Sequence, residues 1–247
     1  MRNADLTYDK RMTQIDTERG AWSLWGTRES AAALALLDFD WIGLDAQHGR
    51  FDDARVIDAI SGIRAVRAEL PVWVRVRSND DGLIGRALDA GANGVIVPMV
   101  DDAAQAANAV AASRYAPLGR RSLGPSLQGG GYTAAGGDPA CAVMVETATG
   151  LANCEAIAAT PGLAMIFVGP WDLALALGLS LDALLALEGD ASPLVRIAAA
   201  CAAAGIRAGA YAGTPERGRV LQALGFETVA IATEDSLFAA GAASVLA

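Results

Sequence analysis

The stretch VWVRVRSNDDGLIGRALDAGANGVIVPM, residues 72–99, decides the fold class. It begins and ends with short runs rich in valine, VWVRV (72–76) and GVIVPM (94–99), which predict two strands. Between them, the amphipathic segment DGLIGRALDAG opens on aspartate and closes on glycine, which predicts a helix with ordinary start and stop signals. A strand, a helix and a further strand in this order are typical of two parallel strands joined by a crossover helix.

The same alternation continues in both directions along the chain. Six more apolar runs predict strands, namely AWSLW (21–25), WIGLD (41–45), AVMVE (142–146), MIFVG (165–169), RAGAYA (207–212) and TVAIAT (228–233). Most of the runs are continuously apolar, as expected for a parallel sheet that is covered on both faces. About eight strand–helix units in 247 residues predict one α/β domain, a single (β/α)8 TIM barrel spanning 1–247, with a doubly wound open sheet as the alternative.

Composition excludes several classes of partner. The formal net charge is −9 and the pI is near 4.6, so neither nucleic acid nor an anionic membrane surface is an expected partner. The polar segment 1–20 lacks the apolar core of a signal peptide, and no run of 18 apolar residues occurs, which favours a soluble cytoplasmic protein. Cys141, Cys154 and Cys201 are widely spaced, which predicts free thiols in place of a disulfide or zinc framework.

One segment interrupts the regular alternation. Residues 114–140, RYAPLGRRSLGPSLQGGGYTAAGGDPA, are rich in glycine and proline and fall between the fourth and fifth predicted strands. A loop that follows a barrel strand lies over the catalytic face, so we expect a mobile lid there.

Barrel enzymes carry their reactive groups at the carboxyl ends of strands. The second predicted strand ends in Asp45, Gln47 and His48, the only histidine of the chain. An imidazole titrates near neutral pH, so His48 is either a general base or an ordinary polar residue of a turn. Arg75 lies inside an apolar strand, where it needs an anion, so it either forms a structural ion pair or stabilises a substrate oxyanion.

Two carboxylates follow later strands. Glu146 ends the fifth predicted strand, and Asp172 comes shortly after the sixth. Two carboxylates together with water and substrate oxygens suit a hard divalent cation such as Mg²⁺ or Mn²⁺. A Zn²⁺ site is harder to build from one histidine and unclustered cysteines. The alternative is that both acids satisfy the backbone donors of the helices that follow them.

Three blocks of the chain, residues 39–52, 71–124 and 143–178, together resemble the HpcH/HpaI family. They include the motifs LDAQHGR, GVIVPMV, RYAPLGRRSLG and VGPWDLALALG, and the resemblance covers most of the chain from about Gly20 onward. The family comprises metal-dependent, class II pyruvate aldolases, including 4-hydroxy-2-oxoheptanedioate and 2-dehydro-3-deoxyglucarate aldolases. The resemblance implies a barrel of the phosphoenolpyruvate/pyruvate type and a carbon–carbon lyase that adds the enolate of pyruvate or hydroxypyruvate to an aldehyde.

The resemblance also implies how the substrate is held. Glu146 and Asp172 are expected to bind Mg²⁺ or Mn²⁺, with Co²⁺ or similar ions as substitutes and with no organic cofactor. Arg75 is expected to stabilise the enolate oxygen. The backbone at the start of the helix that follows the predicted strand 165–169 is expected to bind the pyruvate carboxylate, through Gly169, Pro170 and Trp171.

Proton transfer is assigned to His48, with Asp89 as its carboxylate partner, and Asp45 is expected to arrange metal-bound water. Gln47 is expected at the substrate, although many relatives carry glutamate there. Met144 stands where many relatives carry glutamine, which bears on the choice of aldehyde. The single lysine, Lys10, lies in the polar N-terminal segment, so a Schiff-base mechanism is not expected.

Two alternative functions and an oligomeric state are also expected from the sequence. A CoA-ester lyase acting on malyl- or citramalyl-CoA would use a basic cluster such as Arg114, Arg120 and Arg121, and a non-catalytic binding barrel is the other rival. The C-terminal stretch, about 235–247, is almost uncharged after Asp235, and a helix that is apolar nearly all round must be covered. The resemblance implies that this helix packs on a neighbouring subunit in a hexamer built as a trimer of dimers; the alternative is that it closes its own barrel.

Overall fold

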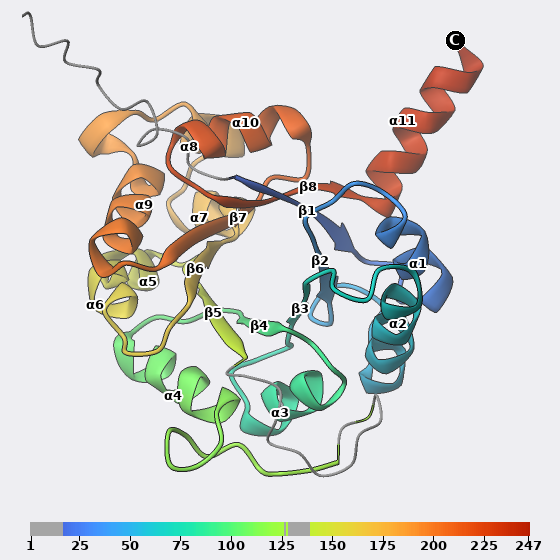
Figure 1. Cartoon of the computed structure of the whole chain (residues 1–247). Coiled ribbons are helices and arrows are strands. Elements are labelled where there is room, and N and C mark those ends of the chain that lie inside the picture. Colours follow the sequence, from blue (N-terminus) through green and yellow to red (C-terminus); the bar gives the residue numbers. More distant parts are fainter. Residues whose placement is uncertain (1–16, 126, 128–138) are drawn as a thin grey trace, which may run out of the picture.

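The computed structural model describes residues 17–125, 127 and 139–247. In this part of the chain eight parallel strands form a closed barrel, each paired with the next and β8 with β1 (Figure 1). The strands are β1 (Glu18–Ser23), β2 (Trp41–Asp45), β3 (Val72–Arg75), β4 (Gly94–Val97), β5 (Ala140–Met144), β6 (Met165–Val168), β7 (Arg207–Tyr211) and β8 (Thr228–Thr233). The predicted TIM barrel is confirmed, and closure of β8 onto β1 excludes the open sheet.

Helices surround the barrel in Figure 1. They are α1 (Arg28–Ala35), α2 (Asp53–Val66), α3 (Asp81–Asp89), α4 (Ala103–Ser113), α5 (Ala148–Ala152), α6 (Cys154–Ala158), α7 (Pro170–Ala176), α8 (Leu181–Leu185), the 3₁₀ helix η2 (Gly189–Ala191), α9 (Pro193–Ala204), α10 (Pro215–Ala223) and α11 (Glu234–Leu246). Many begin at a side chain that accepts a backbone N–H, such as Asp52 before α2 and Asp80 before α3. None of the described helices is long and apolar enough to cross a membrane.

The barrel interior is packed with aromatic rings and is not a channel. Its buried side chains come from alternate positions of the strands, and they include Trp22, Trp41, Ile96, Ala142, Met144, Met165, Phe167 and Ala230. Gly43 faces this layer, and a Cβ added there would lie 2.5 Å from the Trp22 ring. The glycine is therefore required by the close approach of the tryptophan.

Two strands start earlier than their apolar runs predict. β1 begins at Glu18 and pairs with β8, while β5 spans Ala140–Met144, so that Glu146 lies just beyond the strand. Glu18 forms an ion pair with Arg207 at 2.8 Å on the rim of the barrel. Glu18 and Arg19, the charged start of β1, escape a search for apolar runs.

The lid prediction is wrong for the described part of 114–140. Residues 114–125 follow α4, and residue 139 leads into β5, so these described parts connect a helix to a strand and belong to the face opposite the carboxyl ends of the strands. Arg114 Nη2 donates to the carbonyl of Gly162 at 3.0 Å, and Gly162 is itself in a helix-to-strand connection. Residues 126 and 128–138 lie outside the described residues, as do residues 1–16 of the polar N-terminal segment.

The three cysteines are free, as the sequence predicts, and the structure buries all of them. Burial raises the pKa of the Cys141 thiol to about 12, so this thiol stays protonated at neutral pH.

Candidate active site

A cavity of about 220 Å³ opens at the carboxyl ends of the strands. Its walls are Trp22, Leu24, Asp45, His48, Arg75, Met144, Phe167, Gly169, Trp171, Asp172 and Tyr211. Six of these residues are site residues predicted from the sequence. The fold brings them together because parallel strands of a barrel all end at the same face.

An ion pair between Asp45 and Arg75 forms the floor of the site. The two residues are register partners on adjacent strands, and both are buried. Arg75 Nε donates to Asp45 Oδ1 at 2.9 Å, and Arg75 Nη2 donates to Oδ2 at 2.5 Å, which makes a two-pronged contact. Arg75 Nη1 points elsewhere, with Met144 Sδ at 3.9 Å, so it keeps donor capacity for a ligand.

Trp22 supports both partners of this ion pair. Its Nε1 donates to Asp45 Oδ2 at 3.2 Å, and its ring lies 5.3 Å from the Arg75 guanidinium carbon. Burial alone would raise the pKa of Asp45, but the hydrogen bonds and charge of Arg75, with the His48 N–H and Trp22, lower it below its ordinary value. Asp45 is therefore held as a carboxylate, and its oxygens are occupied by protein donors.

The turn after β2 is tied to the same carboxylate. The backbone N–H groups of Gln47 and His48 donate to Asp45 Oδ1 at 3.0 and 3.1 Å. This turn presents the exposed His48 side chain to the cavity. The Gln47 side chain does not line the cavity; its Oε1 is buried and has no hydrogen-bond partner among the described residues.

Glu146 is buried beside the cavity with one oxygen satisfied and one free. Its Oε1 accepts the backbone N–H of Met99 at 2.9 Å. Met99 has φ 58°, a left-handed conformation that is unusual for a methionine and that directs its N–H toward the carboxylate. Glu146 Oε2 is buried and has no hydrogen-bond partner among the described residues. Such an oxygen needs a hydrogen-bond donor or a cation to compensate its lost hydration.

Gly169 brings Glu146 and Asp172 to one place. A Cβ added at Gly169 would lie 2.5 Å from Glu146 Oε2 and 3.6 Å from Asp172 Oδ2, so both oxygens border the same space. α7 starts here with Pro170, which has no N–H, and no side chain caps its first turn. Backbone donors of Trp171 and Asp172 thus face outward at the helix start.

Electrostatics at Glu146 favour a cation. Burial is the largest influence and raises the pKa of Glu146; the charges of Asp172 and Asp45 act in the same direction, while the Met99 N–H and Arg75 oppose them. In the described part of the chain no three His, Cys, Asp or Glu side chains form a protein-only metal cage. The two carboxylates nevertheless fit Mg²⁺ or Mn²⁺, which often take one or two protein carboxylates and fill the other positions with water and substrate.

The family model described as HpcH/HpaI aldolase/citrate lyase matches residues 19–239. The chain belongs to this family. It is 37% identical over 225 residues to a hydroxypyruvate/pyruvate aldolase of Rhizorhabdus wittichii, covering 88% of each chain. It is 33% identical to another from Paraburkholderia phytofirmans, covering 91% of this chain and 90% of the relative. A solved HpcH/HpaI family structure from Burkholderia cenocepacia superimposes with a TM-score of 0.82 at 29% identity, covering 95% of both chains.

Asp89 is not brought to the site of this HpcH/HpaI barrel. It is the last residue of α3, at the face where the strands begin, and its carboxylate pairs with Arg121 at 2.7 Å. Within this chain the structure therefore provides no contact between Asp89 and His48. The two residues of one chain do not meet because a helix runs back from the catalytic face, so its last turn lies at the opposite end of the barrel.

Sequence reasoning missed Trp22, Tyr211 and the Met99 backbone. The two aromatic residues lie near the carboxyl ends of predicted strands, the same signal that identifies Asp45, but aromatic residues in strands usually indicate core. A backbone N–H carries no mark in the sequence at all.

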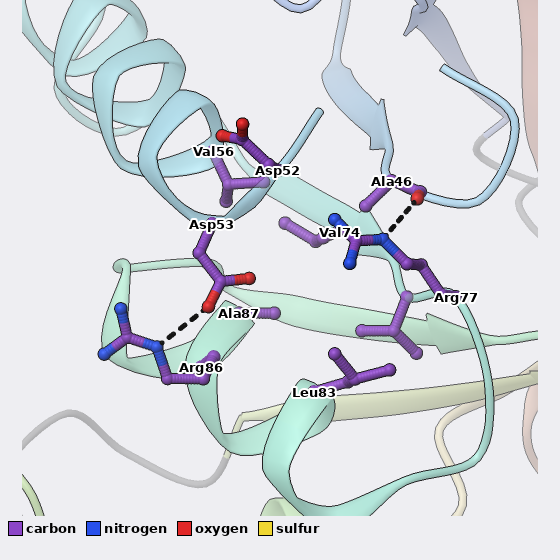
Figure 2. Close-up of a pocket in the computed structure, with 10 residues that line it drawn as sticks. Ala46, Asp52, Asp53, Val56, Val74, Arg77, Leu83, Arg86 and Ala87 are labelled. Carbon is purple, nitrogen blue, oxygen red and sulfur yellow. Dashed lines mark hydrogen bonds and ion pairs between the residues drawn. The ribbon is translucent and has the colours of Figure 1, made fainter. Parts of the chain in front are cut away.

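A second, much smaller pocket of about 20 Å³ lies outside the barrel, between the starts of α2 and α3 and the outer face of β3 (Figure 2). Figure 2 shows Arg86 bonded to Asp53 at its edge, at 3.1 Å, and Arg77 Nε reaching the Ala46 carbonyl at 3.3 Å. Arg77 is exposed. The space is too small for a substrate. The first contact joins α3 to α2, and the second joins the segments that follow β3 and β2.

Proposed function

We propose that this protein is a divalent-metal-dependent aldolase that forms the enolate of pyruvate or hydroxypyruvate and adds it reversibly to an aldehyde. The reverse direction cleaves a 4-hydroxy-2-oxo acid. The observation that carries the proposal is the unpartnered Glu146 Oε2 beside Asp172, next to a cavity that also contains Arg75 and His48. The relatives named hydroxypyruvate/pyruvate aldolase support the same chemistry.

Glu146 and Asp172 would hold Mg²⁺ or Mn²⁺. Bound there, the cation supplies Lewis-acid polarisation of the 2-oxo acid. The ion would also compensate the buried carboxylate of Glu146, whose pKa is raised by burial and by neighbouring acids.

Arg75 stabilises the charge that develops on the substrate's C2 oxygen. The bidentate contact with Asp45 holds the guanidinium in place before substrate arrives, and Nη1 retains a donor for the oxyanion. His48 takes a proton from the substrate's C3 carbon, directly or through water. The outward backbone donors of Trp171 and Asp172 bind the substrate carboxylate. Asp45, whose oxygens already serve five donor groups, acts through Arg75 and the His48 turn.

The CoA-ester lyase alternative loses its sequence argument. Arg120 is engaged by Asp81 at 2.6 Å and Arg121 by Asp89 at 2.7 Å. Arg114 donates to Gly162 on the face opposite the cavity. These guanidinium groups do not form a free basic surface beside the site for CoA phosphates.

The C-terminal helix is proposed to pack on a neighbouring subunit, in a hexamer of three dimers. α11 projects away from its own barrel in Figure 1, and of its residues only Glu234 is buried. Phe238, Val245 and Leu246 are 66%, 84% and 85% exposed. A helix with this apolar surface needs cover that its own barrel does not provide.

The test is a coupled assay of pyruvate release. A set of 4-hydroxy-2-oxo acids is supplied with Mg²⁺ or Mn²⁺, and pyruvate is followed with lactate dehydrogenase and NADH. The proposal expects cleavage that EDTA abolishes and added metal restores. Cleavage that is indifferent to EDTA, or that persists in Glu146→Gln, would contradict it.

A further inference from the structure

Three aromatic rings that line the cavity, Trp22, Tyr211 and Trp171, form a row between two arginines. From the floor, Arg75 lies 5.3 Å from the Trp22 ring, and the Trp22 and Tyr211 rings are 5.7 Å apart. The Tyr211 and Trp171 rings follow at 5.2 Å, and the Arg217 guanidinium carbon lies 5.2 Å from the Trp171 ring. Arg75 has a role in the proposed reaction, but Arg217 has none so far.

Arg217 is a half-buried cation without an anionic partner. Among the described residues its side chain makes no ion pair or hydrogen bond; only its backbone N–H is engaged, by Thr214. Nearby acids have other partners, since Glu216 lies 3.8 Å from Arg219 and Asp235 accepts Trp25 Nε1 at 3.1 Å. Stacking on a ring uses the face of a guanidinium and leaves its in-plane N–H donors available.

The position of Arg217 suits the far end of a substrate. The 2-oxo end of a 4-hydroxy-2-oxo acid belongs with Arg75 and the two carboxylates, so the part contributed by the aldehyde extends toward the mouth. Gly213 keeps that wall open: a Cβ there would lie 3.3 Å from Trp171 Cη2 and 3.4 Å from the Tyr211 hydroxyl. Beyond Trp171 the available recognition group is the Arg217 fork, whose planar donors match a carboxylate.

Building on the proposed aldolase function, we propose that Arg217 determines specificity by selecting acceptor aldehydes that carry a carboxylate at the end remote from the carbonyl. A neutral acceptor leaves the guanidinium unpaired at the rim, whereas a carboxylate gains a charge-assisted contact that is shielded on one side by Trp171.

The test compares two non-reacting ligands of equal chain length, 2-oxoadipate and 2-oxohexanoate, which differ only in the distal carboxylate. Their affinities for the Mg²⁺-loaded protein are measured by calorimetry for wild type, Arg217→Met, Arg217→Lys and the control Arg219→Met. Arg219 lies two residues along the same helix and is exposed at its ion pair with Glu216. Wild type and the control are expected to prefer 2-oxoadipate by about tenfold or more. Arg217→Met is expected to lose this preference, and Arg217→Lys to keep part of it.

Equal affinity of the wild type for both ligands, or an unchanged preference in Arg217→Met, overturns the assignment. An equal loss of affinity for both ligands in Arg217→Met also overturns it, because that result indicates a structural role only. Exchange of the pyruvate methyl protons is recorded on the wild type in parallel. Selective binding of 2-oxoadipate without proton exchange refutes the proposed aldolase function and supports the carboxylate subsite. Proton exchange without selective binding supports the aldolase function and refutes the subsite.

Discussion

The role proposed for Arg75 depends on a single carboxylate that holds its guanidinium in place. Asp45 fixes two of its three guanidinium nitrogens, and the Trp22 ring covers its face. A guanidinium held this way needs no reorganisation when charge develops on the substrate, which is the main source of electrostatic catalysis. The cost is a buried ion pair whose partners depend on each other.

Replacing Asp45 with asparagine should therefore destabilise the fold in a pH-dependent way. Breaking a buried pair typically costs about 3–5 kcal/mol, which urea unfolding at neutral pH measures. Because the pKa of Asp45 is lowered in the folded state, its carboxylate contributes stability above the unfolded-state pKa and loses it as the pH falls through the folded-state pKa. The difference between wild type and Asp45→Asn should thus shrink in acid. An exposed pair supplies the control: Asp53→Asn should cost less than about 1 kcal/mol. A loss for Asp45→Asn that is the same at every pH would contradict this account.

Unlike the Asp45 carboxylate, the Glu146 carboxylate should destabilise the fold when no cation is present. Its pKa is raised, chiefly by burial, so the ionised form is unfavourable in the metal-free fold. Metal-free Glu146→Gln should melt at or above the wild-type temperature. With Mg²⁺ at about 100 times its Kd, the wild type should gain about 2.7 kcal/mol and the variant nothing. Scanning calorimetry with and without EDTA measures both effects, and an equal gain in the variant would remove Glu146 from the metal site.

At this scale, the sequence predicts charged groups at strand ends and little else. Asp45, His48, Arg75 and Asp172 all line the cavity because each follows or ends a strand. Asp89, which rested on resemblance alone, lies at the other end of the barrel. The Met99 N–H depends on a left-handed backbone conformation, which no residue type at that position announces.

Elements of this barrel are specified by where large and small residues face each other. Gly43 on β2 exists to admit the Trp22 ring, and Trp22 in turn reaches Asp45. Packing inside the barrel and geometry at the site are therefore linked through one strand pair. Apolar runs predict all eight strands, but they miss the charged start of β1. They also do not distinguish a loop that follows a strand from a loop that follows a helix, and for this reason the sequence wrongly predicts a lid after α4.

Gly43→Ala tests this link directly. Its Cβ would overlap the Trp22 ring, so the variant should lose about 1–3 kcal/mol of unfolding free energy. Gly85→Ala in α3 is the matched control, since a Cβ there meets nothing within 4 Å. Alanine is the better helix former, so this control should gain about 0.5–1 kcal/mol. Urea unfolding measures both changes in unfolding free energy, and equal changes for Gly43→Ala and Gly85→Ala would contradict the packing argument.

At the scale of the whole molecule, α11 is the feature that the single barrel leaves unexplained. It is joined to the barrel by Glu234, which accepts the backbone N–H of Leu24 at 2.9 Å, and by the stacking of Phe238 on Trp25 at 5.1 Å. Beyond that point its residues are exposed. The proposed hexamer would cover them.

The variant Phe238→Glu/Val245→Glu should consequently form smaller assemblies than the wild type in light scattering. Two charges on the apolar face of α11 oppose its burial against another chain. Leu36→Glu, at a 74% exposed position near the end of α1, is the control and should keep the wild-type mass. A monomeric wild type, or a double variant of unchanged mass, would refute the proposed assembly.

The most direct test of the central claim is NMR of pyruvate methyl-proton exchange in D₂O, because enolate formation needs no aldehyde. With Mg²⁺ or Mn²⁺ the protein should catalyse exchange; EDTA or Glu146→Gln should abolish it, and His48→Ala should slow it by about 100-fold or more. Absence of exchange with both pyruvate and hydroxypyruvate, in a folded and metal-loaded sample, would contradict the assignment of this site to enolate chemistry.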